Sequence, residues 1–83
     1  MSKIDKVLDM VFSMSRDVKE ARITRARPEG SAPMVDISAV VGKERVVHWV
    51  RMEAELLDHP KVLKDTLDHL AIQIEQGHQA PST

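Results

Sequence analysis

The 83-residue sequence contains no cysteine and only two aromatic residues, Phe12 and Trp49. Without cysteine the chain has no disulfide, no thiolate nucleophile and no cysteine-ligated zinc. With so few aromatic side chains, it also lacks the platforms on which single-stranded nucleic acids stack their bases. Its core must therefore be built from Val, Leu, Ile, Met and Ala.

Long apolar runs are also absent. No stretch approaches the ~18 apolar residues that a membrane helix needs. Asp5 and Asp9 interrupt the apolar residues near the N-terminus, which argues against a signal peptide. Together with the lack of cysteine, these features predict a cytoplasmic protein with no membrane partner.

The charges nearly cancel, with 12 Lys and Arg against 13 Asp and Glu. No overall field therefore draws the chain to nucleic acid or to an anionic membrane. The composition predicts one small globular domain over residues 1–77, followed by a polar, disordered tail at 78–83. A domain of this size buries little surface, and no disulfide supports it. We therefore expect a homodimer.

Two segments have the spacing of amphipathic helices. Apolar residues recur at steps of three and four over residues 3–20, which predicts the first helix. The second is expected to start with Asp58 as its cap and Pro60 near its first position, and to stop at Gly77. Its apolar face comprises Leu63, Leu67, Leu70, Ala71 and Ile74.

The region between these helices has the features of strands. Residues 21–27 predict a short strand, and 28–33 contain two prolines and a glycine that break it. Apolar and polar residues then alternate over 35–41 and again over 46–56.

Gly42 and Lys43 separate the two alternating runs and are typical of a hairpin turn. A competing interpretation makes residues 43–57 helical, and the sequence leaves it open. We predict an α+β fold in the order helix, short strand, β-hairpin, helix (α-β-β-β-α). It is a three-stranded antiparallel meander with both helices on one face.

The outward face of this hairpin is the first candidate site. Exposed Trp and Arg on an apolar strip have the composition of a protein interface. An open alternative buries Trp49 in the core. The predicted interface residues are Val40, Arg45, Val47, Trp49 and Arg51. This face predicts a small non-enzymatic binding protein, an adaptor, regulator or inhibitor, that pairs with itself or with a protein partner.

A basic segment suggests an alternative function, nucleic-acid binding. The helix-strand-strand-strand-helix order is that of the double-stranded-RNA-binding fold, although the last helix of this chain is largely acidic. The candidate contacts for an anion or nucleic acid are Arg16, Lys19, Arg22, Arg25 and Arg27.

Catalytic and metal-binding patterns are missing. Gly42-Lys43 lacks the earlier glycine and the following Ser or Thr of a phosphate loop. Asp65 and His69 share a helix face, but two ligands do not make a metal site. His48 is expected on the inward face of its strand. We predict no enzyme activity, no cofactor and no metal.

Overall fold

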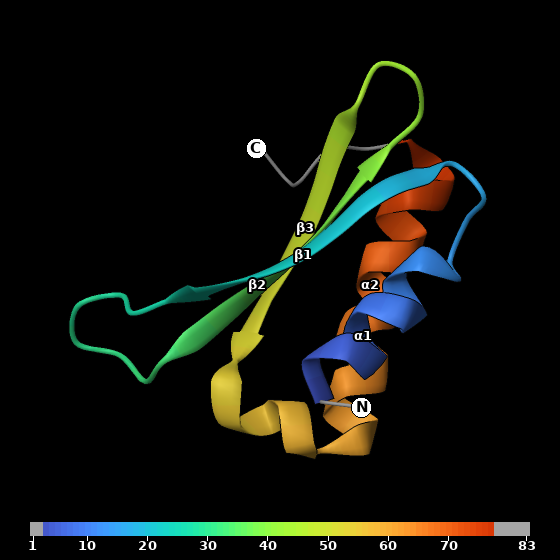
Figure 1. The fold of residues 1–83 in the computed structure, drawn as a ribbon. Helices are drawn as coiled ribbons and strands as arrows, with labels where there is room; N and C mark the ends of the chain where they lie inside the picture. The colour runs from blue at the N-terminus through green and yellow to red at the C-terminus, as the bar shows by residue number, and fades with distance from the viewer. Residues whose placement is uncertain (1–2, 78–83) are drawn as a thin grey trace.

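The computed structural model describes residues 3–77. It contains two α-helices, a three-stranded antiparallel sheet and one 3₁₀ helix, and it confirms the predicted α+β fold. In chain order the elements are α1 (Lys3–Phe12), β1 (Val18–Ala26), β2 (Met34–Val41), β3 (Val46–Glu53), η1 (Ala54–Asp58) and α2 (Pro60–Gln76). Both helices lie on one side of the sheet, and no helix or strand of residues 3–77 covers its other side (Figure 1).

The strands are ordered β1-β2-β3, with β2 in the centre. Ile37 of β2 lies opposite Ile23 of β1 and Val50 of β3. Because side chains alternate along a strand, this register places all three residues on the same face. The alternating residues of 35–41 and of the strand from residue 46 therefore contribute their apolar side chains to the same face.

The helices cover the apolar face of this sheet and form the core with it. α1 packs mainly on β1, and α2 packs mainly on β3. The fully buried side chains at the centre are Val7 and Val11 of α1, Ile37 of β2 and Leu70 of α2. The predicted apolar stripe of the second helix is thus the stripe that packs on the sheet.

The first helix is shorter than predicted, because it ends at Phe12 rather than at residue 20. The hydroxyl of Ser13 donates to the carbonyl of Asp9, and the amide of Asp17 donates to the hydroxyl of Ser15. Such local bonds compete with helical ones and turn the chain. Val18, which extends the helical spacing, instead begins β1 opposite Val41.

The third strand also ends earlier than predicted, at Glu53 rather than residue 56. The amide of Ala54 still bonds the carbonyl of Pro33, but β2 begins at Met34 and offers no further ladder. The next residues therefore form η1. The helical alternative for residues 43–57 is wrong except for this single turn.

The ends of the second helix are partly as predicted. Pro60 occupies the first turn, and Gly77 ends the helix at a φ of 71°, a left-handed conformation that glycine adopts easily. The predicted Asp58 cap is wrong. His59 holds the cap position without a side-chain hydrogen bond, while Asp58 forms an ion pair with Lys3.

Within residues 3–77, no helix combines the length and apolarity needed to cross a bilayer. The predicted tail at 78–83 lies outside the described residues.

Candidate binding surfaces

Trp49 lies on the bare outer face of the sheet, and 39% of its surface is exposed. The register explains this position. Trp49 alternates with His48 and Val50, which face the helices, and it lies opposite Ser38 of β2. Its neighbour on the same face, Val47, is 48% exposed and lies opposite Val40. The structure therefore answers the question that the sequence left open about Trp49.

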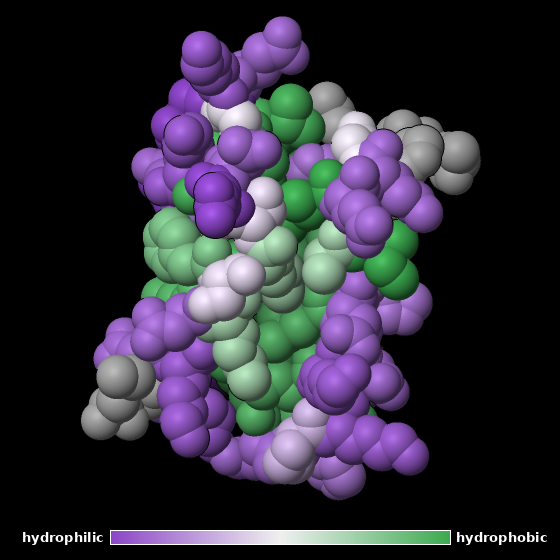
Figure 2. Space-filling model, turned by 90° about the vertical axis from the view of Figure 1, so that its right-hand side faces the viewer, coloured by the Kyte–Doolittle hydropathy of each residue, from purple (hydrophilic) through white to green (hydrophobic). Residues whose placement is uncertain are grey.

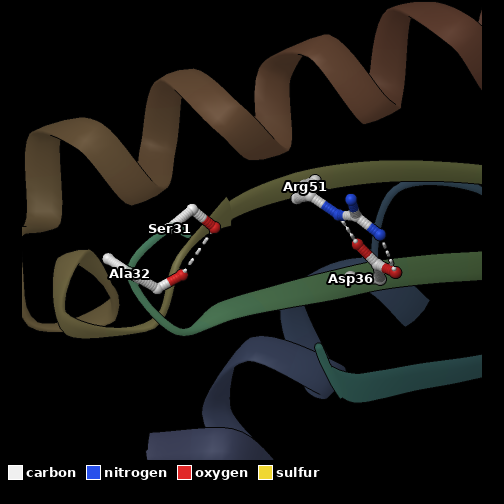
Figure 3. Close-up of polar contacts among 4 residues, drawn as sticks. All are labelled: Ser31, Ala32, Asp36 and Arg51. Carbon is white, nitrogen blue, oxygen red and sulfur yellow. Dashed lines mark hydrogen bonds and ion pairs between the residues drawn. The ribbon is translucent and has the colours of Figure 1, made fainter. Parts of the chain in front are cut away.

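The outer face also carries an ion pair that the register places directly (Figure 3). Asp36 and Arg51 are cross-strand partners. The Nε of Arg51 donates to Oδ1 of Asp36 at 2.6 Å, and a second guanidinium nitrogen donates to Oδ2 at 3.0 Å. This bidentate bond and the carboxylate charge raise the pKa of Arg51. The guanidinium also lies over the Trp49 ring, 5.8 Å from its centroid.

Arg45 lies in the turn before β3, at a φ of 56°, rather than on the strand. Its guanidinium reaches across to the carboxylate of Glu20 on β1, with 2.8 Å between the nitrogen and the oxygen. Arg22 lies 3.8 Å from the same carboxylate. Arg51 therefore has a carboxylate of its own, whereas Arg45 and Arg22 share that of Glu20.

Four of the predicted interface residues thus come together on the outer face: Val40, Val47, Trp49 and Arg51. We call Val40, Val47 and Trp49 the tryptophan patch. Arg45 borders this face from the turn.

The predicted basic segment does not form one surface. Arg22 pairs with Ser38 on the outer face, whereas Arg25 pairs with Val35 on the face that the helices cover. Arg16 precedes β1 and Arg27 follows it, at opposite ends of the strand. Apart from Arg22, the members of this segment have no ion-pair partner among residues 3–77. Basic side chains on an edge strand such as β1 also discourage pairing with another sheet.

A polar residue lies in the apolar core. His48 is only 2% exposed, as predicted from its inward position, and its Nδ1 has no hydrogen-bond partner among residues 3–77. Across the interface between β3 and α2, Gln73 donates to the carbonyl of Trp49 at 3.2 Å. The Oε1 of Gln73 is also buried, without a partner in the described part of the chain. Gln73 thus satisfies one carbonyl on the open edge of the sheet.

A second surface, which the sequence analysis missed, is a groove of about 670 Å³ between α1 and α2. In Figure 2 the hydrophobic residues (green) run between two rows of hydrophilic residues (purple). Val7, Leu63 and Leu67 form its floor, and Leu57 and Pro60 line one end. The spacing of three and four residues predicts an apolar face on each helix. The sequence does not show that both helices pack on the sheet with few contacts between them, and the groove follows from that separation.

Among residues 3–77, no three acidic or histidine side chains gather as a metal site would require. Asp65 and His69 are exposed on α2 without a third ligand. The candidate binding surfaces are therefore the outer face of the sheet and the groove between α1 and α2.

Comparison with known proteins found no match: no family model, no curated protein and no solved structure resembles this chain significantly.

Proposed function

We propose that this protein is a small non-enzymatic binding protein that forms a homodimer through the outer face of its sheet. The observation that carries the proposal is the placement of Trp49 and Val47, side by side on a face that no element of the described residues covers. Large aromatic side chains dominate the affinity of protein interfaces when they become buried. In the isolated chain this one is substantially exposed to water.

A second copy is the partner that fits this face best. Its ion pairs, Asp36 with Arg51 and Glu20 with Arg45, leave Arg22 as the one arginine of the described face without a carboxylate of its own. Two copies can therefore approach without strong like-charge repulsion. Sheets pack face to face in this way at a spacing of about 10 Å. The two tryptophan patches then bury one another.

The size of the face sets the expected strength. Three strands of about eight residues span a plane of roughly 14 by 26 Å. This plane is smaller than the ~800 Å² that each partner contributes to a standard interface. We therefore expect a dimer that dissociates on dilution, in the cytosol as in the test tube.

Sedimentation velocity over a range of protein concentrations tests the proposal. The wild type is expected to move from monomer to dimer as concentration rises, and Trp49→Ala is expected to stay monomeric. Ile72→Ala is the matched control, because Ile72 is as exposed as Val47 but lies on α2. A wild type that remains monomeric, or equal dimerisation of the Trp49 variant, contradicts the proposal.

Nucleic-acid binding through the basic segment is the weaker alternative, because that segment is divided between two faces. It predicts a fluorescence change of Trp49 on addition of double-stranded RNA. That change would be lost in salt and in an Arg25→Glu, Arg27→Glu variant. Such a result in a monomeric protein would replace the dimer proposal.

A further inference from the structure

We infer that the groove between α1 and α2 binds an amphipathic helix of a partner protein. The inferred helix lies antiparallel to α1 and α2 and carries acidic residues in its last turn. This inference does not depend on dimer formation, because residues of α1 and α2 line the groove, whereas the tryptophan patch lies on the outer face of the sheet.

The shape of the groove matches a short helix. α1 contributes Lys3, Lys6, Val7 and Met10, a stripe that follows one side of the helix, and Met14 continues it beyond the helix end. α2 contributes a matching stripe between Pro60 and Ala71. The eleven helical steps from Pro60 to Ala71 rise about 16 Å, or about three turns. Partner helices insert apolar side chains at such spacing into grooves of this kind.

The groove lining is apolar and adaptable. Its floor residues, Val7, Leu63 and Leu67, are almost completely buried beneath it. Met10, in contrast, is 49% exposed on the α1 side, and Met14 is half-buried near the open end. Unbranched methionine side chains adjust to different apolar partners and are frequent in helix-binding grooves.

The charges determine the preferred orientation. The ion pair between Lys3 and Asp58 holds the start of α1 beside the start of α2, so the two helices run parallel (Figure 1). Both positive dipole ends therefore lie at the same end of the groove. The side chain of the cap residue, His59, accepts no hydrogen bond from the amides of the first turn of α2.

Three lysines and two aspartates line the groove, which leaves an excess of one positive charge. Lys64 is paired with Asp68 at 2.9 Å, which raises the pKa of Lys64. Lys3 is paired with Asp58. Lys6 lines the groove and has no ion-pair partner among residues 3–77. An antiparallel helix places its negative dipole end and its last-turn carboxylates beside Lys6.

The test uses a fluorescein-labelled synthetic helical peptide of about 14 residues. Leucines spaced along its sequence at i, i+3, i+4 and i+7 form its apolar face. One peptide carries Glu in its last turn, and the second carries Lys there. Fluorescence anisotropy against the full chain measures both affinities. We expect the acidic peptide to bind at least about tenfold more tightly, with the difference reduced by salt.

Variants of the protein locate the binding. Lys6→Glu is expected to reverse the preference between the two peptides, and Lys6 is exposed, so this change leaves the core intact. Ala71→Arg obstructs the groove wall and is expected to weaken both peptides. Ile72→Ala and Trp49→Ala are the controls expected to bind normally, since neither residue lines the groove. Circular dichroism verifies that each variant is folded.

Several results would overturn the inference. Equal affinity for the two peptides, or normal binding by Ala71→Arg, shows that the groove is not the site. Displacement of the peptide by equimolar laurate identifies an acyl-chain groove instead. Loss of dimer mass in Ala71→Arg without peptide identifies a second copy as the occupant. If Trp49→Ala loses the dimer and Ala71→Arg keeps it, the result supports the proposed dimer interface and leaves the groove available to a partner helix.

Discussion

The two faces of the sheet are built from the same strands yet are stabilised in different ways. On β2, Val35, Ile37 and Ala39 face the helices and are at most 2% exposed. Asp36 and Ser38, between them on the same strand, face solvent and are only half-covered. The inner face gains free energy from burial of apolar surface. The outer face is ordered by cross-strand pairs, of which Asp36 with Arg51 is the clearest.

This difference shows where binding energy is still available. Apolar side chains of the inner face already have partners within the fold. On the outer face Arg45 and Arg51 are paired with carboxylates, so Val47 and Trp49 are the side chains that gain most from a new contact. On the helix side of the molecule, the groove between α1 and α2 is the place where apolar residues can gain a new contact.

The largest expected effect compares two neighbours on β2. Ile37→Ala removes a fully buried side chain at the centre of the core and is expected to lower the free energy of unfolding by about 3 kcal/mol. Ser38→Ala, on the outer face, is expected to change it by less than about 0.5 kcal/mol. Urea unfolding followed by circular dichroism measures both. Similar losses would mean that the outer face is packed in the isolated chain.

A smaller effect of opposite sign concerns His48. His48→Leu replaces a buried ring whose Nδ1 lacks a partner and is expected to raise the free energy of unfolding by about 1 kcal/mol. The same urea titration measures it, and His69→Leu on exposed α2 is the control expected to give no gain. Destabilisation by His48→Leu would show that the imidazole makes a contact essential to the inner face.

The smallest effect concerns the ion pair on the outer face. Arg51→Ala removes the guanidinium that covers Trp49, so acrylamide is expected to quench Trp49 fluorescence more efficiently in the monomer. The change in stability is expected to be smaller than that of His48→Leu, because exposed ion pairs contribute little. Unchanged quenching would contradict the described contact.

That ion pair also has a defined pH dependence. The pKa of Arg51 is raised in the folded state, so its contribution is fully present below the unfolded pKa and is lost only at strongly alkaline pH. The stability difference between wild type and Arg51→Ala is therefore expected to be constant from about pH 6 to 9. A slope across that range would implicate a different group.

The sequence predicted the sheet well because period-two alternation is a strong signal that both strands of the hairpin share. Alternation over 35–41 and from residue 46 correctly placed His48 inside, but it left open whether Trp49 lies outside or in the core. It failed at element ends. Val18 fits the spacing of the first helix as well as it fits a strand. Only the pairing with Val41 of β2, a residue distant in the chain, decides between them.

The candidate sites were predictable to different degrees. Alternation predicted which residues share the face of the tryptophan patch if residues 46–53 form a strand, and the register of β2 and β3 brings Val40 beside Val47. The groove depends on the distance between α1 and α2, which is set by how each packs on the sheet. Similarly, the basic segment looked continuous along the chain, but strand geometry separates Arg22 from Arg25.

Trp49 offers the most direct test of the central claim, because it is the only tryptophan and lies at the centre of the proposed interface. We would measure acrylamide quenching of its fluorescence while diluting the wild-type protein. Burial of Trp49 in a dimer predicts weak quenching at high protein concentration and strong quenching at low concentration, because dissociation of the dimer exposes the ring. Strong quenching at every concentration would contradict it, since the outer face would then remain uncovered.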